Sequence, residues 1–378
     1  MRHRDLAVPF ALALALALVA PAISAQQPAA DGPYKVLKTA RVGGEGGSDY
    51  IYADVVGRRL YIPRGGSRAF PATDTSAARP AVPGRITVFD LETLAPLGEI
   101  PGTGGNGVAV DPTSGHGFSS SKPVSMFDTK TLKLIKTIDV GAAQPDGILF
   151  DAYNDRVYVF SHPTKDAIVI DARDGTVLGT IDLGGVPEQG VADGKGTLYV
   201  VMQDAEGSVT KVDVNTMKAT AHYPFGDKGG CNGLALDVRT RTLFAACARS
   251  GNPPAQPPQP MMVVLSADDG QLLASLPLAG SSDGAAFNPE TREAFSSHSN
   301  GTMTVVKERT SGSFEVTQTL QTMLGARTLT FDSRTNRILT MSVERGPVPA
   351  GSPASGPGGR PPQGPMIPGS FTILVIGR

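Results

Sequence analysis

Seven polar residues each stand at the start of a predicted β-strand, at similar intervals along the chain. They are Asp49, Asn106, Asp146, Gln189, Asn232, Asp283 and Arg327. Carboxylate and amide oxygens suit Ca²⁺ or Mg²⁺, while the guanidinium of Arg327 could hold an anionic ligand. A structural role is the alternative, in which each residue caps its own strand and hydrogen-bonds the next repeat. Because the position recurs in every repeat, the pattern favours the structural role.

Two histidines follow predicted strands and could act as a general base or as metal ligands. His298 lies in the segment FSSHSN and His162 in FSHP, near the face that the seven polar residues share. Histidines in non-adjacent repeats are more often surface or loop residues. We therefore place His298 among the predicted ligand-binding residues and assign no catalytic residue.

Repeats of about 40 residues must position these side chains. The clearest repeat spans 144–184 and contains four segments rich in β-branched and aromatic residues, at 147–150, 156–160, 167–171 and 177–182. Turns bearing Asp, Asn or Gly separate the four segments. Four strands in such a length make one blade of a β-propeller.

Two further positions recur in every repeat, at regular distances after the polar residue that opens the first strand. An acidic or amide residue closes each first strand (Asp54, Asp111, Asp151, Asp193, Asp237, Asn288 and Asp332), and a large apolar residue follows in the second strand (Tyr61, Phe118, Tyr158, Tyr199, Phe244, Phe295 and Leu339). Small residues such as Gly107 and Gly233 alternate with larger ones in the first strands. That alternation suits a crowded centre where seven inner strands converge.

The seventh repeat contains only three predicted strands, of which the last spans 371–377. The segment 34–42 has the character of an outer strand and precedes the first repeat. We expect it to pair with the C-terminal strand, which would remove an open sheet edge. The predicted fold is therefore all-β, a single seven-bladed β-propeller of four-stranded antiparallel blades over 34–378.

Several repeats resemble those of YVTN-repeat proteins of the YncE-like group: GVAVDPTSGHGF, GILFDAYNDRVYVF, GLALDVRTRTLF and LTFDSRTNRIL. The resemblance covers 34–378 and implies a bacterial, exported seven-bladed propeller with WD40-like architecture. The asparagine of the family motif is missing, because Arg64, Ser121, Ser161, Met202, Cys247, His298 and Ser342 stand at its positions. The resemblance therefore implies the fold, and no binding role for those positions.

The N-terminus carries Arg2 and Arg4 before an Ala-rich apolar run that ends in small residues. This pattern predicts a secretory signal peptide over 1–25, cleaved after Ala25 or Ala22, and a flexible segment over 26–33; an uncleaved anchor is the alternative.

Removing 1–25 takes away two arginines and one aspartate, so the net charge moves from −1 to −2. Without a basic excess, nucleic acid is not an expected partner. We expect a periplasmic or secreted monomer with no membrane span after cleavage.

Export would place both cysteines in an oxidising compartment. If the turn after the first strand of the fifth repeat lies at 238–241, the resulting hairpin sets Cys231 opposite Cys247. We predict a disulfide between them. The alternative is a pair of small buried apolar side chains.

Three segments rich in Pro, Gly, Ala and Ser interrupt the first, fifth and seventh repeats, at 65–84, 250–260 and 346–370. Each falls between the second and third strands of its repeat. That connection lies on the same face as the loop entering the first strand, so the insertions should overhang the mouth of the channel. They are either tolerated surface insertions or arms that cover the channel or dock a partner.

These features favour an exported, non-enzymatic propeller that binds an unknown protein or small-molecule ligand on its insertion-bearing face, with no cofactor. The alternative is a lactonase-like hydrolase that holds Ca²⁺ or Mg²⁺ in the channel, with Asp146 or His298 as base. Against this alternative, the first polar position is never Glu; Glu45 and Glu188 only lie near it. An accessory protein of a periplasmic redox enzyme is a third possibility.

Overall fold

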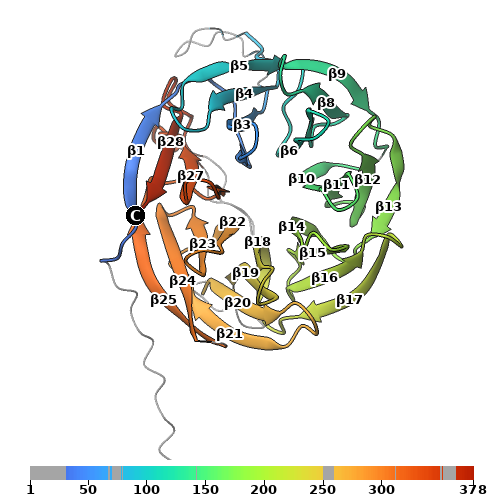
Figure 1. The fold of residues 1–378 in the computed structure, drawn as a ribbon. Coiled ribbons are helices and arrows are strands. Elements are labelled where there is room, and N and C mark those ends of the chain that lie inside the picture. Colours follow the sequence, from blue (N-terminus) through green and yellow to red (C-terminus); the bar gives the residue numbers. More distant parts are fainter. Residues whose placement is uncertain are drawn as a thin grey trace, which may run out of the picture.

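The structure is a computed structural model that describes residues 31–378, apart from 67–68, 70–77, 79, 142, 250–258, 311, 350 and 352–362. In this part of the chain, seven sheets of four antiparallel strands stand around a ring (Figure 1). The predicted seven-bladed β-propeller is thereby confirmed. No helix in the described ranges has the length and apolar character needed to cross a membrane. The predicted signal peptide and most of the three insertions lie outside the described residues.

The first four blades follow one another along the chain. Blade one contains β2 (Tyr52–Asp54), β3 (Arg59–Arg64), β4 (Arg85–Asp90) and β5 (Pro96–Pro101), and blade two contains β6 (Val108–Asp111), β7 (His116–Ser119), β8 (Val124–Asp128) and β9 (Lys133–Ile138). Blade three contains β10 (Pro145–Asp151), β11 (Arg156–Ser161), β12 (Asp166–Asp171) and β13 (Val177–Asp182), and blade four contains β14 (Pro187–Ala192), β15 (Thr197–Met202), β16 (Ser208–Asp213) and β17 (Lys218–Pro224).

The remaining three blades complete the ring. Blade five contains β18 (Gly229–Asp237), β19 (Thr242–Arg249), β20 (Met261–Ser266) and β21 (Leu272–Pro277), and blade six contains β22 (Ser282–Asn288), β23 (Glu293–His298), β24 (Thr302–Thr310) and β25 (Ser313–Gln321). Blade seven contains β26 (Leu329–Asp332), β27 (Arg337–Ser342) and β28 (Thr372–Gly377), with β1 (Lys35–Arg41) as its outer strand. In blades two to six, the first strand (β6, β10, β14, β18 and β22) lies nearest the axis (Figure 1).

The acidic or amide residue that closes each first strand builds the turn into the second strand. Asp151, for example, accepts a hydrogen bond from the backbone N–H of Tyr153 at 3.0 Å. The fourth residue after it, Asp155, has a φ of 53°. Equivalent left-handed residues follow at Arg58, Arg241, Arg292 and Asn336. The same side-chain-stabilised turn thus recurs around the ring and explains the regular spacing in the sequence.

The apolar core lies between neighbouring blades. Tyr158 and Phe160 of β11 pack with Leu198 and Val200 of β15 in one buried cluster that joins blades three and four. Near the axis the first strands approach closely, because a Cβ on Gly147 would lie 2.9 Å from the carbonyl oxygen of Glu188. Small residues there allow the tight packing that holds the central polar side chains in place.

The ring is closed by the N-terminal strand, as predicted. β1 pairs antiparallel with β28 from Lys35 opposite Gly377 to Arg41 opposite Thr372, and Figure 1 shows the two strands side by side. At the junction with blade one, Arg58 donates to both carboxylate oxygens of Asp332, at 2.8 and 2.9 Å. The two ends of the described chain therefore share blade seven.

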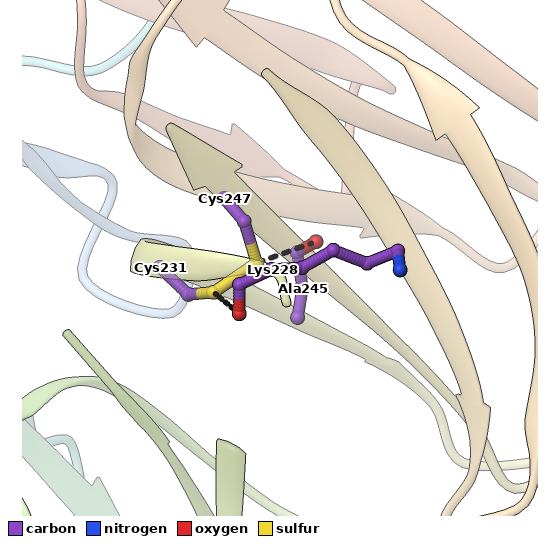
Figure 2. Close-up of a disulfide and its surroundings, with 4 residues drawn as sticks. All are labelled: Lys228, Cys231, Ala245 and Cys247. Carbon is purple, nitrogen blue, oxygen red and sulfur yellow. Dashed lines mark hydrogen bonds between the residues drawn. A yellow bond between two sulfur atoms is a disulfide. The ribbon is translucent and has the colours of Figure 1, made fainter. Parts of the chain in front are cut away.

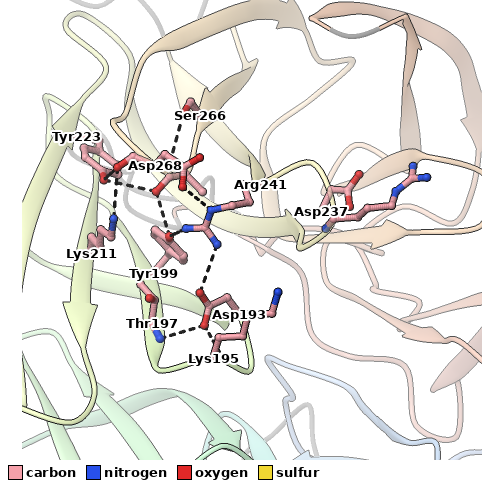
Figure 3. Close-up of polar contacts among 12 residues, drawn as sticks. Asp193, Lys195, Thr197, Tyr199, Lys211, Tyr223, Asp237, Arg241, Ser266 and Asp268 are labelled. Atoms are coloured by element: carbon pink, nitrogen blue, oxygen red, sulfur yellow. Dashed lines mark hydrogen bonds and ion pairs between the residues drawn. The ribbon is translucent and has the colours of Figure 1, made fainter.

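Arg241, in the turn between β18 and β19, ties blade five to blade four (Figure 3). Its Nη2 donates to the hydroxyl of Tyr199 at 2.8 Å, its Nη1 lies 3.4 Å from Asp193, and its Nε donates to Asp268. Asp193 follows the C-terminal end of β14. The network therefore anchors one end of the strand whose other end carries Glu188.

The two cysteines form a disulfide within blade five (Figure 2). Cys231 on β18 lies opposite Cys247 on β19 in the strand register, and both residues are fully buried. The bond closes a loop whose ends are 16 positions apart. A covalent link of this kind restricts the unfolded chain and so stabilises the folded state.

Replacing both cysteines by alanine is expected to lower the free energy of unfolding by about 3 kcal/mol, as for a loop of this length. Urea unfolding with and without a reducing agent would measure the effect. Reductant should destabilise the parent protein and leave the double variant unchanged. Equal stability of the parent under both conditions would contradict a stabilising disulfide.

Candidate functional site

A polar cavity of about 350 Å³ is lined by residues at or just before the starts of the first strands of several blades. Its lining consists of Asp49, Tyr50, Asn106, Gln144, Pro145, Asp146, His162, Glu188, Gln203, Asn232 and Asp283. Five of the eight predicted ligand-binding residues belong to this lining, whereas Gln189, Arg327 and His298 do not. The cavity lies on the face where the second strands end and the third strands begin. The described ends of the three insertions lie on the same face, because each insertion connects a second strand to a third.

Several members of the predicted polar ring bind a neighbour in another blade. Asn106 donates to Asp146 at 2.6 Å, and Asn232 donates to Asp283 at 2.9 Å. Arg327 donates to Asp49 at 2.8 Å and forms an ion pair with Asp283. These contacts are the bonds between blades that the structural alternative predicts.

Among the seven polar residues, Gln189 has the clearest structural role. Its Oε1 accepts backbone N–H groups of Leu234 and Ala285, both at 3.1 Å, and its Nε2 donates to the Ala285 carbonyl at 3.1 Å. One side chain of blade four thus reaches blades five and six. Gln189 therefore holds inner strands together instead of facing the cavity.

Three ionisable side chains converge on one wall of the cavity. His162 Nε2 lies 2.9 Å from Asp146 Oδ2 and 3.5 Å from Glu188 Oε1. Asp146 lies on β10, His162 directly follows β11, and Glu188 lies on β14. All three positions are at or beside the ends of strands, where the fold fixes the backbone.

Two further residues orient the buried carboxylate of Glu188, which is 4% exposed. The hydroxyl of Tyr50 donates to its Oε2 at 3.0 Å. Gln203, which follows β15, donates to its Oε1. Blades one, three and four therefore all contribute to this wall of the cavity.

The surroundings shift the proton affinities of these groups. Burial raises the pKa of Glu188 to about 8, and the charge of Asp146 adds to the rise. Contact with Asp146 raises the pKa of His162. Burial also raises the pKa of Tyr50 well above its usual value, so its hydroxyl remains a donor. A proton or another cation in this cluster relieves the repulsion between the two carboxylates.

His298 lies inside blade six and not at the cavity. Its side chain is fully buried, and its Nδ1 lies 2.9 Å from the hydroxyl of Thr302. Burial lowers its pKa to about 3. His298 is the last residue of β23 and pairs with Ser282 of β22, and its complete burial places the side chain in the protein interior.

The sequence thus predicts Asp146 as a ligand-binding residue, whereas His162 is only a possible base or metal ligand and Glu188 lies beside the recurring polar position. The signal for His162 lies in the repeat itself. The residue four positions after the aromatic of the second strand lines the cavity in blades three and four, as His162 and Gln203. The residue one position earlier points into the blade and is buried, as at Ser161 and Met202.

Comparison with known proteins supports the fold. No protein-family model and no curated protein sequence matches the chain. Among solved structures, the chain is similar to WD40 repeats of RRP9, with 11% identity, a TM-score of 0.65 and coverage of 93% of this chain and 99% of that chain. The fold is a seven-bladed propeller with WD40-like neighbours.

Two other solved structures show the same likeness. U3-55K is 11% identical with a TM-score of 0.64, over 90% of this chain and 98% of that chain. A chain of the hydrazine synthase of Kuenenia stuttgartiensis is 15% identical with a TM-score of 0.63, over 77% of this chain and 91% of that chain. At such identities the likeness shows the architecture alone.

Proposed function

We propose that this chain is an exported, YncE-like binding scaffold that holds a small cationic ligand at the mouth of its central channel. The observation that carries the proposal is the composition of the cavity. Its lining residues include four carboxylates and a histidine, and the described lining contains no lysine or arginine. Several carboxylates in a confined space concentrate cations. The expected ligands are divalent metal ions and small amines or ammonium ions.

Arg327 determines which part of the cavity is available to a cation. It contacts Asp49 and Asp283, so its positive charge compensates those two carboxylates from outside the lining. Asp146 and Glu188 lie on the other wall, where the nearest basic group is His162. A cationic ligand is therefore expected to bind between Asp146 and Glu188.

The position of the insertions supports a scaffold role. Their ends connect β3 to β4, β19 to β20 and β27 to β28, all on the face that carries the cavity. A partner protein that docks on these arms would cover the bound ligand. No observation favours the lactonase-like alternative, which remains a prediction.

A thermal-unfolding screen of the mature chain, freed of bound ions by a chelator, tests the proposal. Divalent ions and small primary or quaternary amines would be added singly. A true ligand should raise the unfolding temperature in a saturable way, since native-state binding contributes about 2.7 kcal/mol at a hundredfold excess over Kd. Asp146→Asn and Glu188→Gln should both remove this stabilisation.

The matched control is Glu206→Gln, which makes the same substitution at an exposed residue in the β15–β16 loop on the same face. This variant should keep the full ligand response. A response that falls equally in all three variants would point to general electrostatic attraction. Failure of every cation to stabilise the protein would contradict the proposal.

A further inference from the structure

We propose that Asp146, His162 and Glu188 form a site for a divalent transition-metal ion, with Nε2 of the imidazole and one oxygen of each carboxylate as ligands. This inference rests on the proposed function and names its ligand class. It differs from the all-oxygen Ca²⁺ or Mg²⁺ site that was the alternative to a structural role for the polar ring. The three side chains come from two adjacent blades and share one wall of the cavity.

The distances between the ligand atoms fit a single ion. One atom of each residue lies within 4.8 Å of the other two. An ion about 2.0–2.2 Å from each ligand holds the ligand atoms about 3–4 Å apart. Small side-chain rotations, with no change of backbone, therefore bring the three atoms to coordinating positions.

The imidazole nitrogen is available for coordination. Nε2 of His162 is buried, and among the described residues it has no aligned hydrogen-bond partner, although Asp146 Oδ2 is only 2.9 Å away. A distance this short without alignment does not satisfy an N–H donor. A metal ion between the nitrogen and the two carboxylates would use the nitrogen lone pair and both negative charges.

Each carboxylate is already oriented by a second contact on its outer oxygen. Asn106 donates to Oδ1 of Asp146 at 2.6 Å, which leaves Oδ2 facing His162. Tyr50 donates to Oε2 of Glu188 at 3.0 Å, while Oε1 faces His162 and also accepts a hydrogen bond from Gln203. Hydrogen bonds that fix the outer oxygens of ligating carboxylates are typical of metal sites. Asn106 and Tyr50 are thus positioning residues.

The ligand set selects the kind of ion. Ca²⁺ and Mg²⁺ prefer oxygen ligands, whereas an imidazole with two carboxylates suits Zn²⁺, Mn²⁺, Fe²⁺ and Co²⁺. Three protein ligands leave further coordination positions, and these would face the cavity. Its volume of about 350 Å³ has room for several water molecules or for one small ligand.

Titration of the chelator-treated mature protein with Co²⁺ tests the site, because the visible absorption of Co²⁺ reports its ligands. We expect one equivalent of Co²⁺ to bind and to be displaced by Zn²⁺. The Glu206→Gln variant should bind Co²⁺ as the parent protein does. His162→Ala, Asp146→Asn and Glu188→Gln should each weaken binding at least 100-fold. Asn106→Ala should weaken it about 10- to 100-fold at unchanged stoichiometry, as expected for a positioning residue.

Separate outcomes overturn the metal site and the proposed function. If Ca²⁺ or an amine stabilises the protein and His162→Ala leaves that binding unchanged, the transition-metal site is wrong while the cationic ligand remains. If Co²⁺ and Zn²⁺ do not bind, the transition-metal site is wrong and the three residues form only an ion-paired cluster. Near-ultraviolet circular dichroism establishes whether each variant is folded. If His162→Ala does not fold, Asp146→Asn and Glu188→Gln test the metal site in its place.

Discussion

A chain that begins at Val42 is expected not to fold into a soluble monomer. It lacks Tyr34 and β1, so β28 keeps its pairing with β27 but loses its other partner from Thr372 to Gly377. All six residues of β28 are buried in the intact ring, and the truncation would expose them along an open sheet edge. The loss is expected to exceed the total stability of a typical domain, about 5–15 kcal/mol.

Size-exclusion chromatography and thermal unfolding of purified chains would measure the effect of this truncation. The matched control begins at Asp31, which keeps Tyr34 and all of β1. It should behave as the chain that begins at Gln26. A monomeric protein beginning at Val42 with an unchanged unfolding temperature would show that β1 does not hold the ring closed.

Replacing His298 by asparagine is expected to make stability less dependent on pH below neutrality. The pKa of His298 is about 3 in the folded protein, below the ordinary histidine value of about 6.5. Between these values the unfolded chain binds a proton that the folded chain does not. The free energy of unfolding therefore falls as the pH drops below 6.5, by up to about 1.4 kcal/mol per pH unit.

Urea unfolding of the parent protein and the His298→Asn variant at pH 7, 6 and 5 tests this prediction. The difference in stability between the two should change by about 2 kcal/mol between pH 7 and 5, in favour of the variant at the lower pH. Thr302→Val removes the partner of Nδ1 and leaves the histidine in place, so it should keep the parent's pH dependence. Parallel curves for the parent and His298→Asn would contradict the prediction.

The fold was predictable because each blade meets the same physical requirements with the same residue types. Asp151 forms the turn that joins two strands, and Tyr158 fills the space between two blades. Both requirements recur seven times and leave a visible period in the sequence. The closing strand was predictable for a related reason, since a seventh blade of three strands would have an open edge.

The candidate site was predictable only in part, because local irregularities decide which side chains face the cavity. In β10 the register shifts between Pro145 and Ile148, and in β14 between Pro187 and Gly190. Such bulges break the simple alternation of a strand. Glu188 therefore turns its carboxylate into the cavity. The adjacent Gln189, which the repeat singles out, bonds to backbone groups of blades five and six.

Ring closure by the two ends of the described chain has a consequence for the order of folding. Val36 pairs with Ile376, so the contact that completes the ring joins segments almost a whole domain apart in sequence. Contacts of such separation form slowly. A chain that emerges from one end during synthesis can assemble blades one to six first, and blade seven must wait for β28. We expect ring closure to be the last step of folding, and transient opening at blade seven to expose the protein to proteases.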